Sequence, residues 1–365
     1  MASARFVGIA AAALIAAAGC AAEPTAEDRK DGGGGFDAAP VGWTTRAELE
    51  GLELRAVWGK GRDLFAAGVG ASLARSDDGG GSWHTVDTGV KGSGAEWPVF
   101  RQLAGTSGTD VWLVGGVADG ESVLLHSADQ GRTWQTRATG EGNDVRAVWA
   151  LDAQRVVIAT GRGMVLRSQD GGATWARAHE QPGVKLLALW GAGDEVFAAG
   201  GVEGTPAGAG DRCDGGEAPD AGAGDERGVL LRSVDGGKTW VVEISNPGGV
   251  LRSVWGTPDA RTVLAAGAHA SIALTGNHGE SWYVDGRAGL LDFDGVWVGP
   301  LGAFFFASPA GVVRSIDYDC RGPVTFSMEQ VPAAADGSKG TAAVWGPSSD
   351  DVWAVGPGGA IRHRP

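Results

Sequence analysis

Four arginines occupy one position of a pattern that recurs along the chain. Arg55, Arg101, Arg146 and Arg252 each stand three residues before a tryptophan, or before the alanine that replaces it once. A guanidinium binds a carboxylate through two parallel N–H···O bonds, so arginines that converge in a concave site would hold an anionic ligand or an acidic peptide. The alternative is that each arginine forms a structural ion pair with an acidic residue of a neighbouring unit.

The arginine set covers only part of the pattern, because the equivalent positions elsewhere are Leu187, Asp294 and Ala342. Trp97 stands in the long segment before Arg101, where it would add an aromatic anchor to a binding site. We therefore predict a ligand-binding site formed by the four arginines and Trp97.

A repeated turn sequence indicates which elements position these arginines. Ser-x-Asp-x-Gly-x-(Ser/Thr)-Trp occurs four times without change, a fifth copy has Thr275 and Asn277 in place of Ser and Asp, and a sixth has decayed around Ser315. The period is about 40 residues once the acidic Gly/Ala-rich insertion at 203–228 is set aside. The unchanged copies end at Trp83, Trp134, Trp175 and Trp240.

Each repeat contains four short apolar segments bounded by Gly or Asp turns, and strand-helix alternation is missing. This pattern is typical of a propeller blade, with a solenoid as the alternative. The last unit has only three such segments, and residues 42–46 supply the missing fourth, so the two ends of the chain complete each other and close a ring. We predict an all-β fold, a seven-bladed β-propeller of four-stranded blades over residues 43–365, closed by an N-terminal strand.

The repeated turns resemble Asp boxes of the bacterial neuraminidase repeat type. Nearly the whole mature chain is similar to the photosystem II stability and assembly factor family, whose members are seven-bladed, non-enzymatic scaffolds that bind a partner protein and carry an arginine-rich patch. The resemblance implies that the boxes are structural and lie at the outer edge, on the face opposite the binding face.

Sialidases share the Asp box, but their chemistry needs a tyrosine nucleophile at the centre of the propeller. Tyr283 follows a box tryptophan and Tyr318 lies in the decayed box, so neither is expected there. Other glycoside hydrolases need two carboxylates, which Asp292 and Asp294 would supply. A glycan-acting sialidase-like hydrolase or a lectin is therefore the alternative to a binding protein without catalytic activity.

No metal or other cofactor is expected. The six histidines lack zinc-ligand spacing, and the acidic insertion lacks the ligand order of a calcium loop. Cys213 in this insertion and Cys320 are expected on opposite faces of the propeller, which argues against a disulfide between them.

The N-terminus predicts export. A single positive charge, Arg5, precedes an apolar run that ends at Gly19-Cys20, so residues 1–19 are expected to be a signal peptide, Cys20 to be lipidated, and residues 20–42 to form a flexible tether. Ordinary cleavage and secretion is the alternative. The net charge of −14 argues against nucleic acid as a partner. We expect a monomeric lipoprotein of the bacterial cell envelope that binds an envelope protein or anionic ligand and touches the membrane only through its anchor.

Overall fold

The computed structural model describes residues 42–46, 49, 51–91, 98–116, 122–140, 144–203, 226–285, 291–299, 302–317, 325–329, 331–333, 337, 340–357 and 361–364. Several predicted features lie outside these residues: the signal peptide, Cys20 and nearly all of the tether, Trp97, most of the insertion, Cys213, Tyr318 and Cys320. The described strands all belong to one compact unit, Ala38–Pro365.

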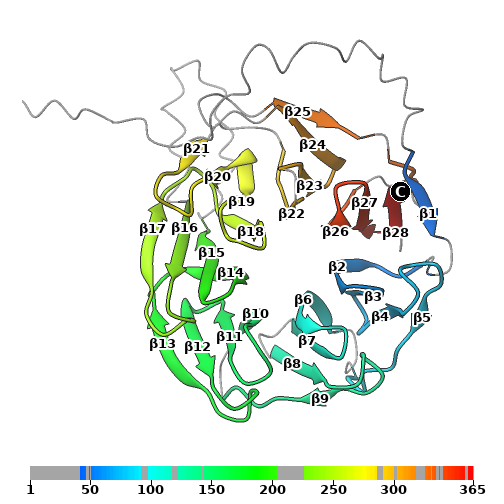
Figure 1. Cartoon of the computed structure of the whole chain (residues 1–365), viewed down its shortest axis with the longest axis horizontal. Coiled ribbons are helices and arrows are strands. Elements are labelled where there is room, and N and C mark those ends of the chain that lie inside the picture. The colour runs from blue at the N-terminus through cyan, green and yellow to red at the C-terminus, as the bar shows by residue number, and fades with distance from the viewer. Residues whose placement is uncertain are drawn as a thin grey trace, which may run out of the picture. The chain divides into compact units, whose positions relative to one another are not determined.

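Within the described residues the strands form seven four-stranded antiparallel sheets, here called blades 1 to 7 (Figure 1). Blade 1 contains β2 (Leu54–Lys60), β3 (Asp63–Gly68), β4 (Leu73–Ser76) and β5 (His84–Thr85). Blade 2 contains β6 (Val99–Ser107), β7 (Asp110–Gly116), β8 (Ser122–Ser127) and β9 (Gln135–Thr136). Blade 3 contains β10 (Val145–Ala150), β11 (Val156–Thr160), β12 (Met164–Ser168) and β13 (Ala176–Glu180).

Blade 4 contains β14 (Lys185–Ala192), β15 (Glu195–Val202), β16 (Arg227–Ser233) and β17 (Val241–Ser245). Blade 5 contains β18 (Leu251–Gly256), β19 (Val263–Gly267), β20 (Ile272–Thr275) and β21 (Tyr283–Asp285), with the short 3-10 helix η2 (Ala268–Ala270) between β19 and β20. Blade 6 contains β22 (Gly295–Val298), β23 (Phe304–Ser308), β24 (Gly311–Asp317) and β25 (Thr325–Met328). Blade 7 contains β26 (Ala343–Ser348), β27 (Asp351–Val355), β28 (Ile361–Arg364) and β1 (Thr44–Arg46).

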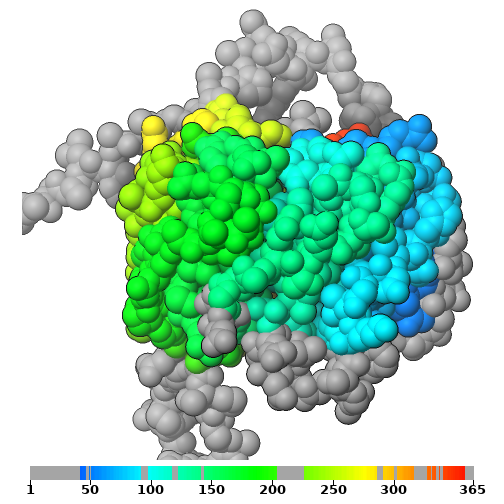
Figure 2. All heavy atoms as spheres, turned by 90° about the horizontal axis from the view of Figure 1, so that it is seen from below, coloured from blue at the N-terminus to red at the C-terminus, as the bar shows by residue number. Residues whose placement is uncertain are grey.

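The inner strand of each blade contacts the inner strands of the two adjacent blades, and β26 contacts β2, so the ring is closed. β1 pairs with β28 in the register Thr44↔His363, which makes the N-terminal strand the outer strand of a blade otherwise built from the C-terminus. Figure 2 shows the edge of the ring, where blue, cyan and green parts of the chain lie side by side in chain order. The all-β prediction is confirmed.

Burial is greatest in the second strands of the blades, is lower in the inner strands and is lowest in the outer strands. The second strands are buried along almost their whole length, because adjacent blades cover both of their faces, whereas β5 and β9 are two exposed residues each. The fourth strand begins one residue after the box tryptophan, because the tryptophan belongs to the turn.

The recurring Trp-Gly sequence is explained by packing between blades. A Cβ atom on Gly105 of blade 2 would lie 2.7 Å from Cη2 of Trp58 in blade 1, and one on Gly256 of blade 5 would lie 2.6 Å from Cη2 of Trp190 in blade 4. Gly59 and Gly346 meet Cη2 of the preceding blade's tryptophan in the same way, whereas Gly191 faces the Nε1 edge of Trp149. Where blade 2 has Ala104 in place of tryptophan, blade 3 has Ala150 in place of glycine.

The Asp boxes are closed hydrogen-bonded turns. In blade 2 the Asp129 carboxylate accepts bonds from Ser127 Oγ (2.9 Å), the Thr133 N–H (2.9 Å) and Thr133 Oγ1 (2.7 Å). Gly131 has a φ of 72°, and a Cβ there would lie 2.4 Å from the Phe65 ring of blade 1. In blade 5 Asn277 keeps the geometry, since its Oδ1 accepts the Ser281 N–H (3.1 Å) and its Nδ2 donates to Ser281 Oγ (2.9 Å). The box residues therefore hold turns and join blades.

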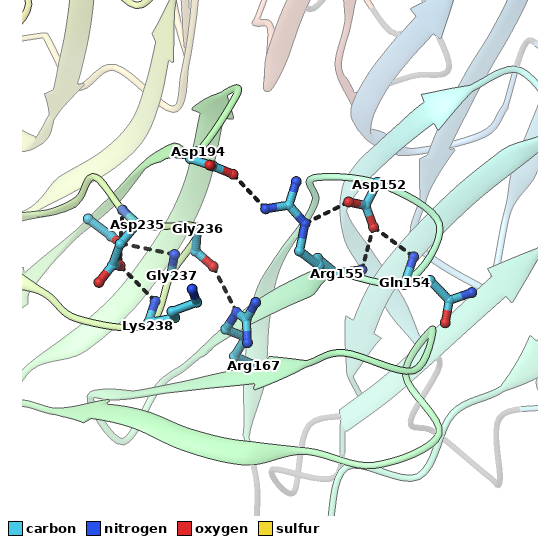
Figure 3. A network of polar contacts seen from close by, with 10 residues as sticks. Asp152, Gln154, Arg155, Arg167, Asp194, Asp235, Gly236, Gly237 and Lys238 are labelled. Atoms are coloured by element: carbon cyan, nitrogen blue, oxygen red, sulfur yellow. Dashed lines mark hydrogen bonds and ion pairs between the residues drawn. The ribbon is translucent and has the colours of Figure 1, made fainter.

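Polar contacts also join blades 3 and 4 (Figure 3). Arg155 bonds Asp152 in its own blade (2.6 Å) and Asp194 in the next (2.5 Å). The buried Arg167 donates from Nε to the carbonyl of Gly236 (2.8 Å). These two arginines take part in ring assembly and lie apart from the arginine set predicted to bind a ligand.

Candidate functional site

The four predicted arginines share a backbone irregularity. In β2, β6, β10, β14 and β18 the register with the second strand shifts by one residue, and the extra residue is Arg55, Arg101, Arg146, Leu187 and Arg252 respectively. A β-bulge of this kind redirects the side chain of the unpaired residue. In blades 6 and 7 the equivalent residues, Asp294 and Ala342, precede the inner strand and bond the second strand through their N–H groups.

Arg252 is held by two carboxylates from the segment that leads into blade 6. Its Nη1 bonds Asp292 Oδ2 at 2.9 Å and Asp294 Oδ1 at 3.1 Å. Burial raises the pKa of Asp294 although Arg252 lowers it, and the charge of Asp292 raises it further. Burial would also raise the pKa of Asp292, but the His269 N–H and Arg252 lower it overall. The two carboxyl groups thus have pKa values moved in opposite directions.

Arg146 and Arg101 form a second group. Arg146 bonds Asp144 Oδ2 at 2.7 Å. Arg101 forms no ion pair or side-chain hydrogen bond with any residue that the structure describes. Its pKa is lowered, first by partial burial and then by the positive charge of Arg146, while Asp144 acts in the opposite direction. Arg101 is thus a partly buried cation beside a second cation.

Arg55 is paired within its own segment, with Glu53, and both side chains are well exposed. Its charge also lowers the pKa of Asp294, so Arg55 and Arg252 both act on that carboxyl group. Arg55 and Arg252 thus act on the same carboxyl group, and Arg146 acts on Arg101. Among the described residues, Arg252 is the only one of the four that makes the inter-blade ion pair of the alternative interpretation.

The loop between β19 and β20 extends the acidic group. His269 and Ala270 have φ values of 55° and 57°, which are unusual for residues other than glycine. The His269 N–H donates to Asp292 Oδ1 (2.9 Å), and its Nε2 lies 3.2 Å from Glu226 Oε2. Sequence reasoning did not place His269 or Glu226 here, because no motif marks a loop whose position depends on the next blade.

The remaining candidates do not assemble a site. Tyr283 lies on the outer strand β21, as expected, and its hydroxyl bonds Asp285 (3.1 Å). No group of three or more His, Cys, Asp or Glu in the described part of the chain is placed to hold a metal ion. No helix among the described residues is long and apolar enough to cross a membrane.

Comparison with known proteins shows the fold. No family model matches the sequence, and no curated protein sequence does so. A solved structure of YCF48 bound to D1 peptide superposes with a TM-score of 0.61 at 18% identity, covering 88% of this chain and 96% of that one. YCF48 from Cyanidioschyzon merolae gives a TM-score of 0.61 at 13% identity, with 88% and 98% coverage.

A GH74 xyloglucanase from Xanthomonas campestris also superposes with a TM-score of 0.61, at 14% identity. The match covers 88% of this chain but 53% of the enzyme, so the chain spans about half of the enzyme's length. At these identities the likenesses establish a β-propeller and leave the function to be argued from the residues.

Proposed function

We propose that this chain is a non-catalytic binding protein that holds an acidic protein segment, or another anionic ligand, where the inner strands of the propeller begin. The observation that carries the proposal is Arg101. It is partly buried at a β-bulge beside Arg146, and no described acidic residue pairs with it. Burying a cation beside another cation is unfavourable unless an anion compensates for it, so a bound carboxylate would stabilise this pair.

A protein ligand is supported at the level of the fold by YCF48, a propeller of the same length class that has been solved with a bound peptide. The resemblance to assembly factors with an arginine-rich patch points in the same direction. Arg101 and Arg146 are the residues through which this chain would use that binding mode.

The proposal is tested with a fluorescent eight-residue glutamate peptide and the purified domain. Arg101→Gln removes the uncompensated charge, and we expect the peptide to bind about tenfold more weakly, the loss typical of one charge-assisted contact. Arg62→Gln is the matched control, because Arg62 is an exposed arginine in the turn after β2, at the other end of the inner strand. Equal affinity in the Arg101 variant and the wild type would overturn the assignment.

A glycan-acting enzyme is the second candidate, and Asp292 and Asp294 are the observation in its favour. Both bond the same Arg252 nitrogen, so these two oxygens are at most about 6 Å apart, compatible with the close carboxylate pair of a retaining hydrolase. Their pKa values move in opposite directions, as in acid/base pairs. The Arg252 guanidinium lies between the two carboxylates. It is better suited to holding two anions in place than to leaving room between them for a reaction. Hydrolysis of a glycan panel that is lost in Asp294→Asn would favour the enzyme.

We further propose that Cys20 anchors the protein to the cell envelope. The support is the sequence before Cys20 and the composition of residues 20–42. Radiolabelled palmitate incorporation and detergent-phase partitioning should both be lost in Cys20→Ala. A wild-type protein that stays in the aqueous phase would instead indicate secretion.

A further inference from the structure

A cavity of about 440 Å³ lies at the end of the ring opposite the arginines. It is lined by residues at the ends of the inner strands and in the turns that follow, including Lys60, Pro258 and Pro347. Six tryptophans of the inner strands contribute to its wall: Trp58, Trp149, Trp190, Trp255, Trp297 and Trp345. Its size is within the range of pockets for small molecules.

The cavity is separate from the arginine site. Each tryptophan stands three residues after the bulge position, which along an extended strand is about 10 Å. Between the two levels, Gln102 bonds the backbone of β10 at Val148 (3.1 Å) and of β14 at Leu189 (2.9 Å), linking three successive inner strands. A ligand in the cavity would therefore not touch Arg101 or Arg146.

Trp149 and Trp255 are less buried than the other four tryptophans. Trp190 is buried against the glycine of the following blade, but Trp255 faces a blade with Val298 at that position. Trp255 packs instead edge-on against Trp149, with ring centroids 6.3 Å apart, and both rings stay partly exposed. The wall thus offers aromatic surface that ring assembly does not use.

The polar side-chain atoms of the wall are all donors. An indole nitrogen and an ammonium group donate hydrogen bonds and accept none, and the other lining side chains are Gly, Ala, Val or Pro. The six indole N–H groups have no acceptor within the described part of the chain, and they are not among the buried unpaired nitrogens there. Among the described lining residues, Lys60 is the only one with a charged side chain.

We propose that this cavity binds a small apolar carboxylate, with its flat body against Trp149 and Trp255 and its carboxylate towards Lys60. Side chains that only donate favour a ligand whose polar group accepts, and the lysine repels cations, although aromatic cages elsewhere favour them. An anion with an aromatic or aliphatic body satisfies the π faces, the N–H groups and the lysine together.

Three naphthalene probes test this inference: 2-naphthoate, the neutral 2-naphthylmethanol and the cationic 2-naphthylmethylammonium, each titrated by calorimetry. We expect the carboxylate to bind tightest and the ammonium weakest. Lys60→Gln should weaken binding of 2-naphthoate about tenfold and leave that of the alcohol unchanged. Lys238→Gln, in an Asp-box turn, is the matched control and should change neither.

Trp255→Leu should weaken binding of both the carboxylate and the alcohol, because it removes a partly exposed face and no inter-blade glycine contact. If this variant does not fold, the inference is still tested by the effect of Lys60→Gln on binding of the charged and neutral probes. The inference is overturned if the ammonium binds as tightly as the carboxylate, or if Lys60→Gln affects all probes equally. Any 2-naphthoate bound at Arg101 is lost in Arg101→Gln, whereas the binding that Lys60→Gln weakens should remain in that variant, so failure of this inference and failure of the peptide proposal are distinguishable.

Discussion

Replacing Asp129 by Asn tests whether the Asp boxes stabilise the ring through charge. The carboxylate of Asp129 accepts a backbone and a hydroxyl bond from Thr133 and one bond from Ser127, and these lower its pKa from 3.8 to about 2. Asn277 in blade 5 shows that an amide fits the same turn, with its Nδ2 donating where the carboxylate accepts. Asp129→Asn should therefore preserve the shape of the turn and remove only the charge.

The expected loss follows from the pKa. A group whose pKa is lower in the folded than in the unfolded protein stabilises the fold above its unfolded pKa, and this stabilisation is lost as the pH falls through the folded pKa. A change from 3.8 to about 2 corresponds to about 2.4 kcal/mol at neutral pH. Because the turn is at the surface, we expect a measured loss of ~1 kcal/mol.

Urea unfolding followed by tryptophan fluorescence at pH 7 and pH 2 measures this difference. The Asn variant should be less stable at pH 7 and nearly equal to the wild type at pH 2. Asn277→Asp is the mirror experiment and should gain stability at pH 7 that it loses in acid. A loss for Asp129→Asn that is the same at both pH values would refute the reasoning, because it would arise from altered shape.

Three further predictions concern contacts between blades. Gly256→Ala should lower the free energy of unfolding, measured in urea, by ~1–3 kcal/mol. The new Cβ would lie 2.6 Å from Trp190 and 2.7 Å from the Thr262 carbonyl oxygen. An unchanged urea midpoint would contradict the explanation of the Trp-Gly sequence. Arg155→Met should cost less than about 1 kcal/mol and lose its effect in 1 M NaCl, since its ion pairs are partly exposed. Arg167→Met leaves the Gly236 carbonyl without its donor and should lower the free energy of unfolding by ~1–3 kcal/mol at any salt concentration. A loss that depends on salt would argue against a role of Arg167 as a hydrogen-bond donor.

The sequence predicted the local structure well where one residue type satisfies one turn. Ser, Asp, Gly and Thr of each box form hydrogen bonds within eight residues, so their spacing carries the whole geometry. The positions of the arginines were also readable, because the bulge recurs at the same distance from the tryptophan. The acidic residues that pair with these arginines could not be predicted from the sequence. Arg252 bonds Asp292 and Asp294 across a blade boundary, whereas Arg146 bonds Asp144 two residues away, and no local pattern distinguishes these outcomes.

The tryptophan cavity was missed for a related reason. Packing between blades explains an inner-strand tryptophan where the next blade supplies a glycine, as it does for Trp58 and Trp190. The blades that depart from the Trp-Gly pattern are the sequence signal of a further role for these tryptophans. Ala104 and Ala150 change together, but Val298 faces Trp255 without a matching change, which leaves an aromatic ring partly exposed. A tryptophan without its glycine is thus the sequence feature that points to the cavity.

The same comparison between blades separates assembly from function at the arginine position. The box glycines and the inner-strand glycines each contact a ring or side chain of the preceding blade, so ring closure accounts for them. The bulge residue has no such requirement, because blades 4 and 7 close with Leu187 and Ala342 at that position. Arg252 can be attributed to its two carboxylates. Arg101, without an acidic partner among the described residues, is accounted for neither by closure nor by pairing, and this is why the binding proposal rests on it.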